Sequence, residues 1–188
     1  MKIREILKET TPHISFEVFP PKTDAAYESV LNATDKIAAL HPSYISVTYG
    51  AGGGTSVNTV NIAAHIRDDL GVESLAHLTC VSSTREHVHK VIGELKEKGI
   101  ENILALRGDI PQESDFPLPN QYRYACELIE EIKGAGDFCI GAACYPEGHV
   151  ESENRKEDVL HLKEKVDRGV DFLTTQMFFD NNVYYNFL

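Results

Sequence analysis

The stretch ILALRGD, residues 103–109, is predicted to be a strand that ends in polar residues, and it decides which parallel-sheet fold the chain adopts. Side chains on a strand point alternately to opposite faces. The alternation assigns Leu104 and Leu106 to a face covered by helices and turns the odd-numbered residues, including Arg107, inward. A doubly wound sheet favours continuously apolar strands, whereas a barrel interior and its rim accept polar side chains. The stretch therefore favours an α/β barrel of the (β/α)8 type.

Outward from this stretch, strand-like and helix-like segments alternate along nearly the whole chain, which is typical of a parallel sheet. The predicted strands are 13–19, 44–48, 74–80, 102–107, 138–145 and 172–178. The predicted helices are 24–40, 56–70, 84–98, 121–133 and 155–168, and a further helix begins at Asn181. A complete barrel has eight such units in about 250 residues. We therefore expect residues 1–188 to form one catalytic barrel domain with about six of the eight units, shortened at its carboxyl end.

Polar residues cluster where the predicted strands end, and barrel enzymes build their sites at this rim. The alternation turns Ser46 and Thr48 inward and places His77 on one face with Leu75 and Thr79. We expect the rim side chains to converge on one cavity: Glu17, Thr48, Thr79, Arg107, Asp109, Tyr145 and Gln176.

An acidic residue, Glu17, lies inside the apolar stretch SFEVFPPK, residues 15–22, which two prolines end. Phe16 and Val18 share one face and Glu17 lies on the other. Burial of an unpaired carboxylate costs several kcal/mol, so its presence in a strand suggests a function such as proton transfer. The alternative is an edge strand with Glu17 facing water, and this stretch alone does not separate the two.

The composition argues against several classes of protein. The chain has 18 Lys and Arg against 29 Asp and Glu, a net charge of -11, which disfavours nucleic-acid and anionic-membrane binding. No apolar run approaches the roughly 20 residues of a spanning helix, and no signal peptide is recognisable, so we expect a cytoplasmic protein. No CxxC or HExxH motif predicts a metal site, and we expect buried free thiols at Cys80, Cys126, Cys139 and Cys144.

Two predicted loops could contact a ligand. YGAGGGTS, residues 49–56, has no Lys after its last Gly and has Thr55 in place of the third Gly of GxGxxG, so it is either a flexible loop or an anion contact. At the end of the fourth strand, Arg107 and Asp109 could form a local ion pair. Alternatively, Gly108 could allow a flat ligand to approach while Asp109 binds its polar edge.

Two further polar groupings follow. Asp158, His161 and Lys165 recur one turn apart on the helix 155–168, which indicates a solvated face unless a ligand covers it. Gln176 is predicted to point inward, where its amide needs hydrogen-bond partners that a heterocyclic ligand could supply.

Six segments together resemble the methylenetetrahydrofolate reductase family: SFEVFPPK, VTYGAGGGT, AHLTC, LALRGD, AACYPEGH and TTQMFFD. They run in order from Ile14 to Asp180. The resemblance implies a (β/α)8 barrel that binds FAD, takes a hydride from NADH or NADPH and reduces 5,10-methylenetetrahydrofolate to 5-methyltetrahydrofolate. It places the protein in one-carbon metabolism and methionine biosynthesis, and it implies a homo-oligomer at full length.

The resemblance also implies roles for individual residues. Glu17 matches the family's general acid, which protonates the folate so that its methylene bridge opens to an iminium. Substrate contacts are implied at Asp109, Gln176 and Thr48. Flavin contacts are implied at Thr48, Tyr49, Ala51, His77, Arg107, Gly108, Asp109, Tyr124, Ala125, Tyr145, His149, Asp158, His161 and Lys165.

The sequence departs from the family pattern at four positions: Cys144, His161, Glu164 and Val170. His161 and Glu164 stand where relatives can carry Asn and Arg, which bears on the FAD phosphate contacts. The alternative to a reductase is a non-catalytic flavin- or pterin-binding subunit, or an inactive fragment.

Overall fold

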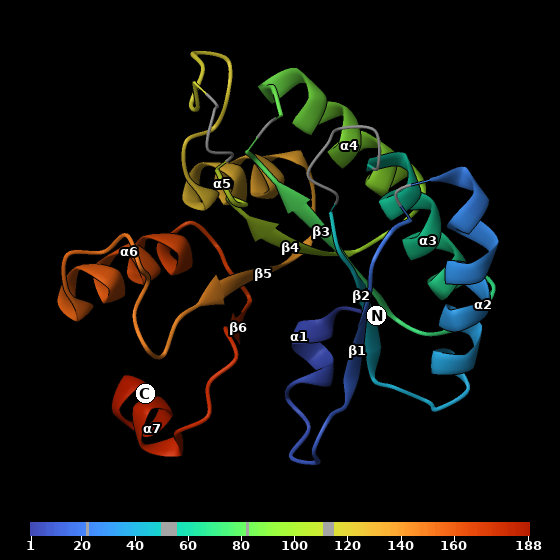
Figure 1. Cartoon of the computed structure of the whole chain (residues 1–188), viewed down its shortest axis with the longest axis horizontal. Helices are drawn as coiled ribbons and strands as arrows, with labels where there is room; N and C mark the ends of the chain where they lie inside the picture. The colour runs from blue at the N-terminus through green and yellow to red at the C-terminus, as the bar shows by residue number, and fades with distance from the viewer. Residues whose placement is uncertain (22, 50–55, 82, 111–114) are drawn as a thin grey trace.

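The computed structural model describes residues 1–21, 23–49, 56–81, 83–110 and 115–188. Within these residues, six parallel strands form one sheet in the order β1-β2-β3-β4-β5-β6. The strands are β1 Ser15–Val18, β2 Tyr44–Val47, β3 Ser74–Thr79, β4 Asn102–Leu106, β5 Cys139–Cys144 and β6 Phe172–Thr175. Figure 1 shows that the sheet curls into an open half-barrel. The predicted α/β barrel type with about six βα units is confirmed.

Helices alternate with the strands, as the sequence predicts. Their bounds are α1 Ile3–Ile6, α2 Tyr27–Ala38, α3 Ser56–Asp68, α4 Arg85–Glu97, α5 Ala125–Ala135, α6 Arg155–Asp167 and α7 Asn181–Phe187, with a 3-10 turn at Asp24–Ala26 before α2. The start of α5 is later than predicted because the backbone N–H groups of Arg123 and Tyr124 both donate to the Glu127 carboxylate, at 2.6 and 2.9 Å. These bonds end the preceding loop and begin the helix.

The main core lies between the convex face of the sheet and helices α2 to α5 (Figure 1). Val18, Ile45 and Val47 contribute to it from β1 and β2, as the alternation predicts. β4 differs from the prediction, because Ile103 and Ala105 also pack in this core, against the helices.

The concave face holds a second, smaller core in which Leu104 packs with Leu75 and with Ile3 of α1. The assignment of Leu104 and Leu106 to the helices and of the odd-numbered residues to the interior was therefore wrong. The register explains it, because His77 pairs with Leu104 and Leu104 with Gly141. A Cβ on Gly141 would lie 2.5 Å from the Phe172 ring, so glycine leaves the space that the interior side chains fill.

The short helix α1, which the sequence did not predict, lies on the concave side near the amino ends of the strands (Figure 1). The buried Asn102 holds it there: Oδ1 accepts from Ile3 N at 2.8 Å, and Nδ2 donates to the carbonyls of Met1 and Ser74, each at 3.2 Å. Arg4 adds an ion pair to Asp171 at 2.8 Å. The contacts of Asn102 and Arg4 thus hold α1 over this end of the half-barrel.

All four cysteines are buried free thiols, as predicted. Burial raises the pKa of each, to about 12 at Cys80. Among the described residues, no helix is both long and apolar enough to cross a membrane. The same residues contain no group of three or more His, Cys, Asp or Glu side chains arranged to hold a metal ion.

Candidate active site at the carboxyl ends of the strands

Glu17 lies on the concave face at the end of β1, as the alternation predicts. Its Oε2 receives a hydrogen bond from Ser46 Oγ at 3.4 Å and lies 3.5 Å from Nε2 of His77. Ser46 shares its hydroxyl between Glu17 and the carbonyl of Phe16, which is also 3.4 Å away. Three neighbouring strands thus bring a carboxylate, a hydroxyl and an imidazole together, with 46% of the Glu17 side chain exposed.

His77 is the buried member of this group, with 8% of its side chain exposed. Burial lowers the pKa of His77 to about 4 because the charged form loses its hydration. The ring is therefore neutral at physiological pH. Its contact with Glu17 meets the distance for an ion pair, but a neutral ring makes it a contact between a dipole and a carboxylate.

Arg107 and Gly108 follow β4 at the same rim. Arg107 forms a two-pronged pair with Glu151, from Nη1 and Nη2 to the two carboxylate oxygens, each at 2.6 Å. The local ion pair with Asp109 considered from the sequence is not formed, and Asp109 is exposed. Gly108 has φ +87°, and a Cβ there would lie 2.5 Å from Val81 Cγ1, so the turn after β4 requires glycine.

Tyr145 and His149 form an aromatic pair in the loop after β5. Their ring centroids are 4.7 Å apart and the rings are nearly perpendicular, at 88°. Burial raises the pKa of the Tyr145 hydroxyl, and the charge of Arg107 opposes this shift. The Nδ1 of His149 accepts from the backbone N–H of Glu151 at 3.2 Å, which connects this pair to the Arg107 contact.

Two of the three polar residues on α6 contact β5 or the loop that follows it. Lys165 is half-buried, donates from Nζ to the Ala143 carbonyl at 2.9 Å and has its pKa lowered by burial, against the charge of Asp158. Asp158 accepts from Ser152 Oγ at 3.1 Å. His161 is exposed and has no hydrogen bond or ion pair among the described residues. The predicted polar face is therefore partly occupied by contacts to β5 and to the loop after it.

The remaining predicted contacts are less closely grouped. Thr48 accepts a hydrogen bond from Thr59 at its carbonyl, and the hydroxyl of Tyr49 contacts Nε2 of His87 at 3.1 Å. Gln176 is exposed, and its backbone N–H donates to the Cys144 carbonyl at 2.8 Å. Tyr124 is exposed and Ala125 is buried where α5 begins. Ala51 lies outside the described residues.

Two residues of this site, Glu151 and Ser46, were not among the site residues predicted from the sequence. Ser46 carried a signal, since the alternation turned it toward the same face as Glu17. Glu151 carried none in a local pattern, because its partner Arg107 is 44 positions away in the sequence.

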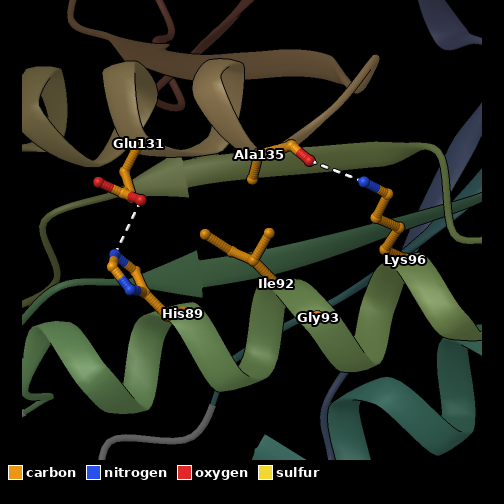
Figure 2. Close-up of a pocket in the computed structure, with 6 residues that line it drawn as sticks. All are labelled: His89, Ile92, Gly93, Lys96, Glu131 and Ala135. Carbon is orange, nitrogen blue, oxygen red and sulfur yellow. Dashed lines mark hydrogen bonds and ion pairs between the residues drawn. The ribbon is translucent and has the colours of Figure 1, made fainter.

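A separate groove of about 340 Å³ lies in the outer layer, between α4 and α5. Figure 2 shows His89 paired with Glu131 at 2.8 Å at one end, and Lys96 donating to the Ala135 carbonyl at 2.9 Å at the other. None of the predicted site residues lines it. The groove is on the helix layer and the candidate site is at the strand ends, so the two are separate features of the molecule.

Solved structures with low sequence identity share this fold. 2,3-Dimethylmalate lyase matches 98% of this chain and 64% of its own, with a TM-score of 0.66 and 12% identity. An uncharacterized protein from Clostridium thermocellum that binds two copies of 5-methyl-5,6,7,8-tetrahydrofolic acid matches 98% of this chain and 61% of its own, with a TM-score of 0.60 and 14% identity. At such identities these matches establish the fold alone.

Sequence relatives are more specific. The chain is 39% identical over 175 residues to 5,10-methylenetetrahydrofolate reductase of Pectobacterium carotovorum, covering 93% of this chain and 57% of that protein. It is 34% identical over 200 residues to methylenetetrahydrofolate reductase (NADH) 1 of Arabidopsis thaliana, covering all of this chain and 34% of that protein. The chain therefore spans somewhat more than half the length of this bacterial relative and about a third of the plant one. Since the family model also matches residues 2–188, the chain belongs to the methylenetetrahydrofolate reductase family.

Proposed function

We propose that this chain carries the proton-donating and flavin-binding part of an NAD(P)H-dependent methylenetetrahydrofolate reductase. The observation that carries the proposal is the placement of Glu17 on the concave face at the strand ends, beside Ser46 and His77, in a chain of this family. Residues 1–188 would form most of one catalytic barrel domain.

The proposed reaction converts a methylene group held between two nitrogens into a methyl group. One carbon–nitrogen bond breaks, the carbon receives a hydride and the released nitrogen receives a proton. Glu17 would donate that proton, and its carboxyl group is the right type of acid for the step. The exposed fraction of Glu17 leaves the carboxyl accessible to a folate entering from the rim.

Bound FAD would accept the hydride from NADH or NADPH and pass it to the folate. The rim offers groups that fit a flavin: the aromatic edge of Tyr145 and His149, and the cations Arg107 and Lys165. Arg107 is held by Glu151, so its guanidinium would have to exchange partners to contact a phosphate. The amide of Gln176 and the carboxylate of Asp109 are exposed and free to reach a pterin ring.

The absorbance spectrum of the purified chain tests flavin binding. We expect a yellow protein that releases FAD on denaturation, and a colourless protein free of FAD would contradict the proposal. Anaerobic bleaching by NADH or NADPH, followed by reoxidation with 5,10-methylenetetrahydrofolate, tests the reaction. Bleaching without folate-dependent reoxidation would favour the alternative, a flavin- or pterin-binding subunit without reductase activity.

Cellular role and assembly are further parts of the proposal. We expect a cytoplasmic enzyme of methionine biosynthesis that assembles as a homo-oligomer at full length. Complementation of a methionine auxotroph and the molar mass in solution test these two points.

A further inference from the structure

The contact between Glu17 and His77 is made by atoms that face each other across the concave sheet surface. β1 pairs with β2 through Glu17 and Ser46, and β2 pairs with β3 so that Ala76 lies beside Val47. His77 is the next residue on β3 and points to the same face as Glu17. Its Nε2 lies 3.5 Å from Oε2 of Glu17, slightly beyond a well-formed hydrogen bond.

Nε2 of His77 is buried and has no hydrogen-bond partner among the described residues. A buried polar atom without a partner is unfavourable, so a small movement that forms the missing bond is favoured. Oε2 of Glu17, 3.5 Å away, is an acceptor that such a movement would bring within hydrogen-bond distance of this nitrogen. Catalytic hydrogen bonds are often long without substrate and shorten in the complex.

The charge state of His77 matters as much as its position. A positive ring at this distance would stabilise the ionised carboxylate and oppose the protonation that a general acid requires. Burial keeps the ring neutral above about pH 4. A neutral Nε2–H can orient the carboxylate and still permit Glu17 to take up a proton.

We propose that His77 is a positioning residue for Glu17: its neutral Nε2–H and the hydroxyl of Ser46 together hold Oε2, so that Oε1 faces the open rim and carries the proton. The catalytic meaning of this arrangement rests on the proposed reductase function. The hydrogen-bonding arrangement itself can be measured without flavin or folate.

The neighbouring strands β2 and β4 place one polar and one apolar side chain beside this pair. β2 presents the hydroxyl of Ser46 to Glu17, and β4 presents Leu104 beside His77. Within the described part of the chain, Glu17 and His77 have each other as their only ionisable contact, and neither forms a hydrogen bond or ion pair with another charged side chain.

The test follows the titration of the Glu17 side-chain carboxyl by ¹³C NMR in the full chain, with Glu17→Gln to assign the signal. Donors to a carboxylate favour its ionised form, so losing one raises the titration midpoint. In His77→Leu we expect the midpoint to rise by about one pH unit, which corresponds to the lower range for a hydrogen bond to a charged group. His77→Gln, which retains an amide donor, should restore at least half of that rise.

His89→Leu is the matched control, since His89 lies on α4 in the outer layer with 54% of its side chain exposed (Figure 2). An unchanged Glu17 midpoint in His77→Leu would overturn the inference, as would equal rises in His77→Leu and His77→Gln, or the same rise in His89→Leu. If His77→Leu does not fold, Ser46→Ala takes its place. A raised titration midpoint of Glu17 in that variant supports hydrogen bonding at Oε2, and an unchanged midpoint overturns the inference.

Kinetics separate this inference from the proposed function. If the function holds, the pH profile of the folate half-reaction should move with the Glu17 midpoint in His77→Gln. If folate is reduced but the Glu17 midpoint is the same in His77→Leu, His77→Gln and the wild type, only the positioning role is overturned. A midpoint that shifts in a chain without folate reduction overturns the proposed function and leaves the arrangement standing.

Discussion

At the amino ends of the strands, α1 lies across the sheet and Asn102 binds three backbone groups, whereas at the carboxyl ends Glu17 is half exposed and His77 keeps an unpaired nitrogen. Both ends are rich in polar residues. The difference lies in what the main polar side chain at each end does. The Asn102 amide is used by backbone groups of the protein and contributes to stability, whereas the half-exposed Glu17 carboxyl is accessible to a ligand, as expected at the carboxyl ends of barrel strands.

The largest expected effect is on catalysis and comes from a substitution at the carboxyl end. Glu17→Gln should slow the folate half-reaction by about 10²- to 10⁴-fold, because general acid catalysis contributes this much, while flavin reduction by the nicotinamide continues. Stopped-flow measurement of the two half-reactions checks it. The thermal midpoint should barely change, since the side chain is half exposed. An equal loss in both half-reactions would show that Glu17 is structural.

A comparable change at the amino ends should affect stability instead. Asn102→Ala leaves Ile3 N and the carbonyls of Met1 and Ser74 without their partner, and we expect unfolding to become easier by about 4 kcal/mol. Urea denaturation measures the loss. The control is Asn32→Ala, because exposed Asn32 makes one bond to the Glu28 carbonyl, and a similar loss there would contradict the role of Asn102.

Acidification should lower the free energy of unfolding of the protein because of His77, which lies at the carboxyl end of the strands. The unfolded chain binds a proton near pH 6.5 and the folded chain only near pH 4, so stability falls as the pH decreases through this window. The loss is at most about 3 kcal/mol. His65 acts in the opposite direction: burial lowers its pKa, but hydrogen bonds to Asp35 and Asp69 outweigh this and raise it.

Comparing denaturation of the wild type and His77→Gln from pH 7 to pH 4 isolates the His77 contribution, because His65 is common to both proteins. The difference between the two curves should shrink as the pH falls. Parallel curves across this range would contradict the buried, neutral state of His77.

The smallest expected effects compare one arginine–carboxylate pair from each end. Asp171 is 15% exposed, pairs with Arg4 and also accepts from Ile140 N at 2.8 Å, so Asp171→Asn should cost about 2 kcal/mol. Glu151 is 54% exposed, and Glu151→Gln should cost less than about 1 kcal/mol. Added salt should reduce the second effect more than the first. Equal losses of unfolding free energy in the two variants would contradict the difference between the two ends.

Much of the fold was predictable because its signals are local. The alternation of strand-like and helix-like segments predicted the order of β1 to β6 and of α2 to α7 within a few residues. α1 was not predicted, since four residues carry no useful periodicity and the helix is held by tertiary contacts from Asn102. The same alternation placed Glu17, Ser46 and His77 on one face, where the structure brings them into contact.

The sequence by itself determined the family, the βα order and the side of β1 on which Glu17 lies, because a strand repeats every two residues and Val18 has to enter the core. Only the tertiary structure decided which face of β4 is interior, since Ile103 and Leu104 are equally apolar and the register with β3 chooses between them. It also decided that Arg107 binds Glu151 and not Asp109, because partners far apart in sequence meet only when the strand ends are assembled.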